Sequence, residues 1–488
     1  MRATMNTRRA KIVATLGPAC ADAAVIARLV DAGVDVFRLN FSHGDPAWQR
    51  AVFARVREAA ALAKKHVAIL ADLQGPKIRF GTFEEGTVFL EKGQRFTIAT
   101  AGPTVGDAQR GYCSYTALPQ DATLGTMILA NDGLLAFRVT EITGTDVVTT
   151  VEVGGPLSDR KGLNFPGLRL RAPAITEKDK VDLALALELG ADIIAVSFVR
   201  SASDLEPVRA AIEAANARAW VVAKIEKPQA VENFDEILAL ADGIMIARGD
   251  LGVELPPERV PVLQKQMIAA ANRVGKPVIT ATQMLESMTV SPRPTRAEVS
   301  DVAGAVDDGT DAVMLSAETA SGKYPVLAVE MMARIVVETE RCLGTPFESR
   351  LDPRAVGDTG AAIASAVVKA SEAVRLDAIA LFTLSGYTAR LVSHARPRTP
   401  ILALTRYEDA ARRLNLLWGV RACVVEHQAT FDDIVQRARQ VVAASVARDS
   451  GLFALLAGLP IEERRITNLM ALLPYGPGPT PAEGALRR

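Results

Sequence analysis

The sequence is poor in the residues on which several common types of site depend. It has four cysteines and four histidines among 488 residues. The cysteines lie far apart and lack the spacing of metal ligands, so we expect neither a disulfide framework nor a zinc site. Three of the histidines lie away from the predicted strand ends described below, which disfavours a nucleophilic triad built on histidine.

The chain also lacks an excess of charge of either sign and any apolar run long enough to span a membrane. Lys+Arg and Asp+Glu number 56 each, which argues against nucleic acid or an anionic membrane as a partner held by bulk charge. The basic amino terminus passes directly into a strand pattern and has no apolar segment of a secretory signal. We therefore expect a cytoplasmic protein that binds neither nucleic acid nor membrane.

Eight short apolar runs separated by helical patterns dominate much of the sequence. They occupy residues 11–16, 34–40, 67–72, 193–198, 221–226, 243–250, 277–283 and 312–319. Nearly continuous hydrophobic strands that alternate with helices are typical of a parallel sheet covered on both faces. Eight such units favour a closed (β/α)₈ barrel, a TIM barrel, over an open sheet.

The interval between the third and fourth runs is much longer than the others and has a different pattern. Residues 75–172 contain strand-like runs, and Asn131-Asp132-Gly133 between two of them is a hairpin signal. We expect an inserted all-β lid domain here, with the catalytic barrel at residues 1–74 and 173–345. Thr176 is the expected N-cap of the helix that returns the chain to the barrel.

A separate α/β region follows the barrel. Helices and strands alternate again over residues 346–475, which we interpret as an open α/β domain that serves effector binding or oligomerisation. Residues 476–488 are rich in proline and glycine and are predicted to form a flexible tail.

Polar residues gather at the carboxyl ends of the predicted barrel strands, where barrel active sites lie. Lys224 and Glu226 are two residues apart on one strand, so both side chains point to the same side. A lysine there neutralises phosphoryl oxygens and a carboxylate holds a divalent cation; the alternative is an ion pair at a strand end. The other candidates at or just beyond strand ends are Arg38, Asn40, Ser42, His43, Asp72, Arg79, Arg248, Asp250, Thr280, Thr282, Ser316 and Glu318.

Together these residues predict a site for a phosphorylated substrate and a divalent metal. The cations Arg38, Lys224 and Arg248, with Arg79 just beyond the third strand, suit a phosphorylated substrate. Glu226 and Asp250, from adjacent strands, suit an oxygen-ligated ion such as Mg²⁺. Gly249 lets a backbone amide approach an anion closely.

Several specific motifs occur in one order along the chain: FRLNFSHG, DLQGPKIR, AKIEKP, MIARGDLG, ATQMLESM, PTRAEVSDVAGAV and MLSAET. In this order, and with the long insertion after DLQGP, they resemble pyruvate kinase. The similarity runs from residue 11 to about residue 345 and continues more loosely through the carboxy-terminal region. It implies a glycolytic enzyme that transfers a phosphoryl group from phosphoenolpyruvate to ADP, giving pyruvate and ATP. It also implies Mg²⁺ or Mn²⁺ as cofactor and a homotetramer.

The resemblance implies a role for each matching residue. Lys224 and Arg38 match the residues that bind the phosphoryl group, and Glu226 and Asp250 match the protein ligands of the metal. The nucleotide-side positions are matched by Asn40, His43, Arg79 and Lys161.

The substrate carboxylate and the final proton transfer involve the last strands. Thr282, with the backbone amides of Gly249 and Asp250, matches the binder of the carboxylate. A water relay through Thr282 and Ser316 that protonates the enolate is a hypothesis; Ser316 as a packing hydroxyl is the alternative.

The sequence departs from the K⁺-dependent members of the family at two positions. Those members hold K⁺ with Asn, Ser, Asp and Thr; Asn40, Ser42 and Asp72 are present here, but Leu73 stands at the threonine position. Lys77 stands where those members have glutamate. A tethered ammonium supplies the same charge as the ion, so we predict that K⁺ is not required. A solvated loop lysine is the alternative.

The C-terminal region contains an expected effector site. Residues 383–388 lie at a strand-to-helix junction, where backbone amides hold a phosphate. Leu384 stands where fructose-bisphosphate-binding members often carry a basic residue, which disfavours that effector. The last segment also disfavours fructose bisphosphate as the effector. It has Glu462, Glu463, Arg464 and Arg465 where a glycine-rich effector loop would be expected. The alternative is an ordinary turn without allostery.

Two other functions stay open at this point. A Mg²⁺-dependent lyase or aldolase acting on pyruvate or phosphoenolpyruvate needs the metal site but not Arg79, Lys161 or the lid. An inactive metabolite sensor would be expected to have lost a residue such as Lys224 or Asp250, and both are present.

Overall fold

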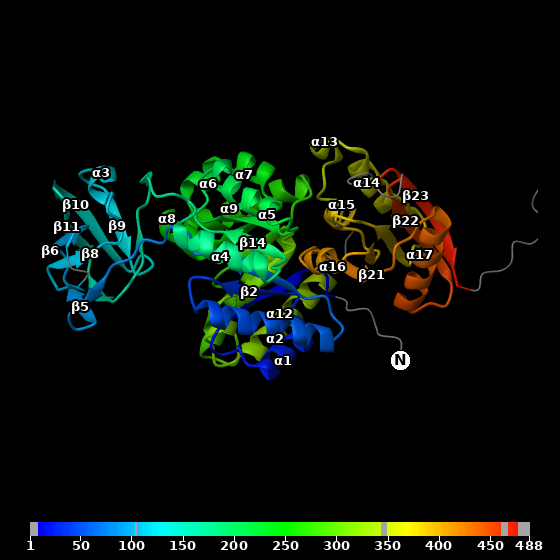
Figure 1. The fold of residues 1–488 in the computed structure, drawn as a ribbon, viewed down its shortest axis with the longest axis horizontal. Coiled ribbons are helices and arrows are strands. Elements are labelled where there is room, and N and C mark those ends of the chain that lie inside the picture. The colour runs from blue at the N-terminus through cyan, green and yellow to red at the C-terminus, as the bar shows by residue number, and fades with distance from the viewer. Residues whose placement is uncertain (1–7, 103–104, 343–348, 460–466, 477–488) are drawn as a thin grey trace, which may run out of the picture.

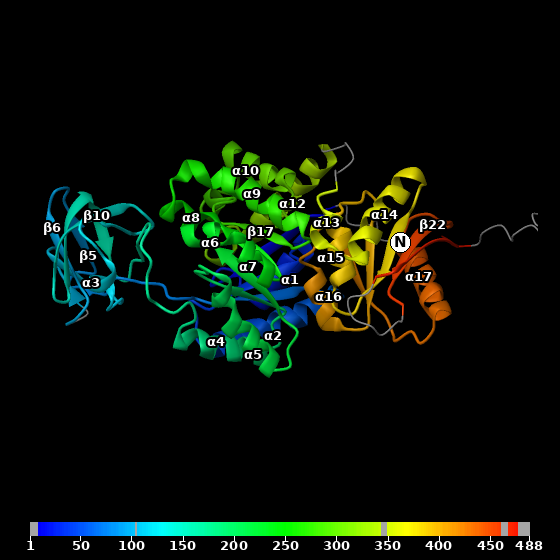
Figure 2. The ribbon, with the colours of Figure 1, turned by 90° about the horizontal axis from the view of Figure 1, so that it is seen from above.

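The computed structural model describes residues 8–102, 105–342, 349–459 and 467–476. The chain forms three parts, with a lid at one end, a barrel in the middle and an α/β domain at the other end (Figures 1 and 2). The predicted tail, apart from Gly476, and Glu462 to Arg465 lie outside the described residues. The limits proposed for the domains stay predictions.

The central part is a closed barrel of eight parallel strands, as predicted. In barrel order the strands are β1 (Lys11–Leu16), β18 (Ala312–Leu315), β17 (Val278–Ala281), β16 (Gly243–Ala247), β15 (Trp220–Ile225), β14 (Ile193–Val196), β3 (Ala68–Asp72) and β2 (Val36–Asn40). Every residue of β1, β3, β14, β15, β16, β17 and β18 is buried. This explains why the strands are recognisable as apolar runs, since both faces of the sheet are covered.

Five predicted strands, β14 to β18, end earlier than expected, and the last three of them end next to polar residues of the site. Arg248 to Asp250 belong to helix α8 (Arg248–Glu254), and β17 ends before Thr282. Ser316 follows β18 and precedes the short helix α11 (Ala317–Ala320). The chain turns sharply at the barrel rim, so these side chains leave the strand geometry on which the prediction relied.

Helices surround the barrel on its outside (Figure 1). They are α1 (Ala23–Ala32), α2 (Pro46–Leu62), α4 (Glu177–Glu188), α5 (Glu206–Ala214), α6 (Pro228–Glu232), α7 (Phe234–Leu240), α9 (Val260–Arg273), α10 (Arg296–Asp308) and α12 (Pro325–Cys342). Thr176 is the N-cap of α4, as predicted: its hydroxyl accepts from the Asp179 N–H while the Asp179 carboxylate accepts from the Thr176 N–H. Among the helices of the described ranges, none has both the length and the apolar character needed to cross a membrane.

The lid is built from short strands and the helix α3 (Leu118–Asp121). Its main sheet has the order β13 (Leu163–Asn164), β9 (Met127–Ala130), β10 (Leu135–Thr143), β11 (Asp146–Val153), β6 (Arg95–Ala99) and β8 (Arg110–Tyr112). Two smaller sheets pair β12 (Gly155–Ser158) with β5 (Thr87–Leu90) and β4 (Thr82–Phe83) with β7 (Val105–Gly106). The predicted hairpin joins β9 and β10, and its three residues have positive φ. A buried cluster of Phe80, Phe96 and Phe137 gives the lid its own core.

The C-terminal domain is a mixed sheet flanked by helices. Its strand order is β21 (Val420–Val424), β20 (Ile401–Thr405), β19 (Ala378–Phe382), β22 (Gly451–Ala457) and β23 (Leu469–Tyr475). The helices are α13 (Pro353–Val356), α14 (Thr359–Ala373), α15 (Tyr387–His394), α16 (Glu408–Leu414) and α17 (Phe431–Ser445). The sequence did not predict β23, which pairs antiparallel to β22 at the sheet edge.

The lid and the C-terminal domain lie at opposite ends of the barrel (Figure 2). The lid follows the carboxyl end of β3, whereas the C-terminal domain covers the amino ends of the strands. Lys11, at the start of β1, donates to the Val420 carbonyl at 2.8 Å, and Arg412 pairs with Asp192, which precedes β14, at 2.7 Å. The carboxyl ends, hereafter the barrel mouth, therefore face the lid.

Candidate active site

A buried cluster of charges occupies the barrel mouth, and Lys224 is at its centre. The Lys224 Nζ lies 2.8 Å from Glu226 Oε1 and 3.2 Å from Asp72 Oδ1, and it donates to Ser197 Oγ at 2.7 Å. The side chains come from three neighbouring strands or their ends. The predicted common orientation of Lys224 and Glu226 is seen directly in their contact.

The charges in this cluster control one another's protonation. Burial opposes the charge of Lys224, but the negative charges of Asp72 and Glu226 outweigh burial, so the pKa of Lys224 is raised above its ordinary value. Burial would raise the pKa of Asp72, but the charges of Lys224 and Arg38 lower it. Lys224 is therefore a permanent cation at neutral pH, held against a permanent anion.

Arg38 lies beside this cluster on β2. Its Nε donates to Asp72 Oδ2 at 2.6 Å, and its Nη1 donates to Thr15 Oγ1 at 3.1 Å. The guanidinium is thus fixed by groups from the strands on both sides of β2. This arrangement places two cations, Arg38 and Lys224, on the two oxygens of one carboxylate.

Gly249, Asp250 and Thr282 meet where β16 and β17 end. The Gly249 N–H donates to Thr282 Oγ1 at 2.7 Å, and Thr282 itself has φ of 68°. Arg248 supports this turn, since its guanidinium donates to the Thr282 carbonyl at 2.7 Å and pairs with Asp301 at 2.6 Å. A threonine with positive φ is strained, and the contacts of Arg248 hold it in place.

Ser316 lies at the end of the neighbouring strand β18. Its Oγ is buried and has no hydrogen-bond partner within the described residues. The buried Glu318 holds the surrounding backbone, because its carboxylate accepts from the Ser316 N–H at 2.6 Å and from the Leu285 N–H at 3.0 Å. Glu318 therefore ties the turn after β18 to the loop after β17.

Glu226 and Asp250 have the charge and burial expected of a pair of metal ligands. Burial raises the pKa of Glu226, and the negative charge of Asp250 raises it further although Lys224 acts against this. Two carboxylates that repel each other in a buried site suit a divalent cation between them. Within the described residues no group of three or more Asp, Glu, His or Cys side chains gathers as a metal site. Mg²⁺ habitually takes one or two carboxylates and fills its other positions with substrate oxygens and water, so the pair fits.

The predicted nucleotide-side residues lie where the lid meets the mouth. Burial and the positive charges of Arg79 and Lys77 lower the pKa of His43, with smaller effects of Arg38 and Lys178. Arg79 is anchored by donating to the Arg160 carbonyl at 3.0 Å, next to Lys161. Several cations thus converge on one side of the mouth, which favours an anionic ligand there.

The positions related to the monovalent ion are partly engaged within the protein. Asn40 Oδ1 accepts from the Ser42 N–H at 3.0 Å. Both oxygens of Asp72 already meet Arg38 and Lys224. Lys77 is half-buried and packs against Gly162 of the lid, because its Cε lies 3.5 Å from the point where a Cβ would stand on that glycine. Within the described residues, no carboxylate forms an ion pair with Lys77.

Sequence reasoning missed the supporting residues of the site. Ser197 contacts both Lys224 and Asp72, and it stands just after β14, at the strand-end position that singled out the other residues. Asp301 was missed because it lies on α10 and reaches Arg248 only through the fold.

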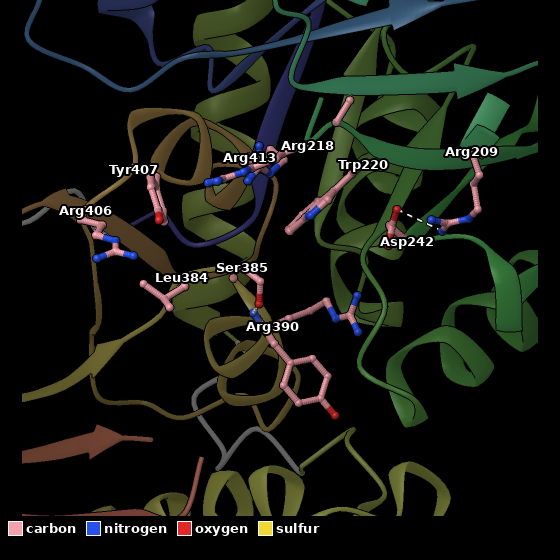
Figure 3. Close-up of a pocket in the computed structure, with 13 residues that line it drawn as sticks. Arg209, Arg218, Trp220, Asp242, Leu384, Ser385, Arg390, Arg406, Tyr407 and Arg413 are labelled. Carbon is pink, nitrogen blue, oxygen red and sulfur yellow. Dashed lines mark hydrogen bonds and ion pairs between the residues drawn. The ribbon is translucent and has the colours of Figure 1, made fainter. Parts of the chain in front are cut away.

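A second candidate site lies between the barrel and the C-terminal domain (Figure 3). Its cavity of about 400 Å³ is lined by five arginines but only one carboxylate, that of Asp242, which pairs with Arg209 at 3.2 Å. The arginines are Arg209 and Arg218 from the barrel and Arg390, Arg406 and Arg413 from the C-terminal domain. The excess of positive charge favours an anionic ligand.

The walls of this cavity also offer aromatic surface and a helix amino terminus. Trp220, Tyr387 and Tyr407 line it, and the guanidinium of Arg218 lies 4.3 Å from the Tyr407 ring centroid. Ser385 and Gly386 of the predicted effector loop precede α15 and line the cavity, and the Gly386 N–H donates to Thr383 Oγ1 at 2.9 Å. Arg413 is 4% exposed; its Nη1 pairs with Asp409 at 2.8 Å, and its Nε has no hydrogen-bond partner within the described residues.

Comparisons with known families match two models over most of the chain. The model "Pyruvate kinase, barrel domain" matches residues 7–329. The model "Pyruvate kinase, alpha/beta domain" matches residues 361–473.

Individual relatives align over almost the full length. Pyruvate kinase 2 of Synechocystis is 46% identical over 94% of this chain and 78% of its own. Pyruvate kinase of Geobacillus stearothermophilus is 43% identical over 95% of this chain and 80% of its own, and that of Mycobacterium tuberculosis is 42% identical over 95% and 98%. The crystal structure of a pyruvate kinase from Cryptosporidium parvum matches with a TM-score of 0.89 and 37% identity, covering 96% of both chains.

Proposed function

This chain belongs to the pyruvate kinase family, and we propose that the residues at its barrel mouth transfer the phosphoryl group of phosphoenolpyruvate to ADP without requiring K⁺. The observation that carries this proposal is the contact of Lys224 with Glu226 and Asp72 in one buried cluster. A loose phosphoryl-transfer transition state demands positioning and charge neutralisation more than covalent chemistry. A cation fixed by two carboxylates supplies both.

The cations of the mouth divide the work of holding the phosphoryl group. Arg38 binds it before transfer, and Lys224 meets its oxygens as the group moves toward the nucleotide. Arg38 has donors left over beyond those used by Asp72 and Thr15, since a guanidinium carries five N–H groups. On the nucleotide side, the ADP phosphates are taken up by Asn40, His43, Arg79 and Lys161.

Glu226 and Asp250 hold Mg²⁺ or Mn²⁺ in this proposal. When bound, the ion supplies Lewis-acid stabilisation of the enolate oxygen. The substrate carboxylate is bound by Thr282 and the backbone amides of Gly249 and Asp250. The Gly249 amide now donates to Thr282 Oγ1, so the hydroxyl marks the position of an oxygen acceptor.

Ser316 belongs to the proton path at the end of the reaction. Its buried Oγ lacks a partner within the described residues, so it is available to a water molecule or to substrate. Ser316 and Thr282 follow adjacent strands, which suits a relay that delivers the proton to the methylene carbon.

Lys77 replaces the monovalent cation. Its charge lies near enough to His43 to lower the pKa of that imidazole, and no described carboxylate neutralises it by an ion pair. Asp72, a residue that the K⁺-dependent members use for the ion, is engaged with Arg38 and Lys224. We infer that this tethered charge takes the role of a bound ion.

The first test is pyruvate formation from phosphoenolpyruvate and ADP with Mg²⁺, in buffer freed of K⁺ and again with K⁺ added. Equal rates support both the activity and the role of Lys77. Activity that appears only after K⁺ is added would support the enzymatic activity and would contradict the role of Lys77 as the substitute cation. If the folded protein is inactive in both buffers, the alternatives named above, a Mg²⁺-dependent lyase or an inactive metabolite sensor, would be favoured instead.

We also propose that the cavity between the barrel and the C-terminal domain binds a phosphorylated effector. Its arginines, the amides before α15 and its aromatic walls suit a phosphate carried on a ring. The test is the phosphoenolpyruvate concentration for half-saturation with a hexose monophosphate or a nucleoside monophosphate added. A shift in this concentration that is absent in Arg209→Ala would support the effector site. If neither compound changes the concentration, the proposed effector site is wrong.

Two further expectations follow from the family and are proposals for this chain. The assembly is a homotetramer, which light scattering of the purified protein tests through its mass. The location is cytoplasmic, which fractionation of the source cells tests.

A further inference from the structure

Glu254 is a buried carboxylate just outside the proposed active site. It is the last residue of α8, and its side chain is 1% exposed. It forms an ion pair with Lys227 Nζ at 2.5 Å and accepts from Asn164 Nδ2 at 2.9 Å. One carboxylate therefore joins three segments that are distant in sequence.

Two of these segments carry the proposed metal ligands. Asp250 lies in the first turn of the same short helix α8, and Lys227 directly follows Glu226. Lys227 also lies 5.4 Å from the ring centroid of Phe198, whose N–H donates to Glu226 Oε2 at 2.7 Å. The Glu254–Lys227 pair thus fixes the distance between the backbone after Glu226 and the helix of Asp250.

The third segment is the lid. Asn164 belongs to β13, which pairs with β9 in the main lid sheet, and it follows Lys161 by three residues. Within the described residues, this is the one hydrogen bond that joins a lid side chain to a barrel side chain. Next to it lies a cavity of about 40 Å³. Apolar residues that follow β13, including Leu168 and Leu170, line it on one side, and Phe198 and Asp250 line it on the barrel side.

We propose that Glu254 is a positioning residue and that its bond to Asn164 is a latch, which joins the lid to the carboxylate that aligns the two metal-bearing segments. The proposal rests on Glu226 and Asp250 as the metal ligands. Glu254 holds the two metal-bearing segments in register whether or not the lid is engaged. Asn164 adds the lid to the same carboxylate and so brings Lys161 toward the nucleotide phosphates.

The two residues therefore have separable effects. Glu254→Gln removes the charge that orders Lys227, and we expect Mn²⁺ affinity, measured by electron paramagnetic resonance without substrates, to fall roughly tenfold or more. Asn164→Ala leaves that affinity within twofold and raises the KM for ADP about tenfold or more, the effect of one hydrogen bond to a charged group. A purely structural role for Asn164 would not affect nucleotide and metal differently.

Polarity reversal gives a stricter test of the latch. Asn164→Asp sets two carboxylates against each other and raises the KM for ADP more than Asn164→Ala does. Adding Glu254→Gln to Asn164→Asp restores a donor–acceptor pair, and we expect the KM for ADP to recover. Glu152→Gln is the matched control, because Glu152 is a half-exposed lid carboxylate that pairs with Arg138 inside the lid sheet.

Glu226→Gln provides the reference for the metal site and keeps the two proposals distinguishable. If Glu226→Gln loses Mn²⁺ binding while Glu254→Gln binds as the wild type does, the positioning role of Glu254 is overturned and the metal site stands. A wild-type KM for ADP in both Asn164 variants overturns the latch. If Glu226→Gln binds Mn²⁺ normally, the assigned metal site is wrong and the coupling to it falls as well.

Discussion

Lys224 and Asp72 form an ion pair in the interior of the barrel mouth, with Nζ and Oδ1 3.2 Å apart. Each charge is stabilised by more than one opposite charge, since Glu226 also faces Lys224 and Arg38 also faces Asp72. Removing one member of such a cluster leaves a buried charge with too few partners. The cluster is therefore both a structural element and the centre of the proposed chemistry.

Replacing Lys224 with methionine tests that centre. We expect kcat to fall by about 10³-fold, because one preorganised charge at the moving phosphoryl group is lost. The volume of the side chain is nearly kept, so the barrel should still fold, with a lower melting temperature. Steady-state kinetics and thermal unfolding check the two effects. A kcat within tenfold of the wild type would contradict the assigned role.

Ser316→Ala separates the proton path from phosphoryl transfer. Since Ser316 Oγ has no described partner, its removal should leave thermal stability unchanged. We expect the exchange of the methyl protons of pyruvate with D₂O, followed by NMR, to slow by about 10²-fold. The KM for phosphoenolpyruvate should change little. An unchanged exchange rate would make Ser316 a packing hydroxyl.

The barrel and the position of its site could be predicted because burial and topology leave a simple pattern. Strands covered on both faces appear as apolar runs, and polar residues at their carboxyl ends must meet at one mouth. Lys224 and Glu226 could be placed together for the same reason, because strand periodicity fixes their direction.

The parts that could not be predicted depend on contacts between distant segments. Asp301 supports Arg248 from a helix, and Glu318, itself a predicted candidate, accepts from the Leu285 N–H in the loop after the neighbouring strand β17. Local sequence pattern carries no signal for such pairs. The edge strand β23 was missed because its alternating burial against β22 follows from a long-range pairing. Thr282 has a positive φ that its residue type does not suggest.

The buried Asp311 at the amino end of the barrel gives a pH-dependent prediction. Burial raises its pKa, but His394 and Arg396 outweigh burial and lower the pKa to about 2, from an ordinary value of 3.8. The stabilisation is fully present above the unfolded-state pKa and is lost as pH falls toward 2, with a total of about 2 kcal/mol.

Asp311→Asn should therefore destabilise the protein most at neutral pH. The difference from the wild type in unfolding free energy should shrink by roughly half near pH 3, where the unfolded carboxyl is already protonated. Chemical unfolding at pH 7 and pH 3 measures this difference. Glu188→Gln, an exposed carboxylate paired with Arg50, is the control and should show little change at either pH. A difference for Asp311→Asn that is constant between the two pH values would be the contrary outcome.

The combination of Lys77→Glu and Leu73→Thr tests whether one side chain replaces a bound ion. The pair restores the residues of K⁺-dependent members, so the positive charge near His43 must then come from solution. We expect the double variant to lose most of its activity without K⁺ and to regain it when K⁺ is added, whereas Na⁺ or Li⁺ restores less. Leu73 is 1% exposed, so Leu73→Thr alone is needed as a control for damage to packing. Lys77→Glu alone should lose activity with no recovery by K⁺, because Leu73 still blocks the fourth ligand position. A double variant that works equally well in both buffers would show that Lys77 is a loop lysine and that the charge it carries is not needed for transfer.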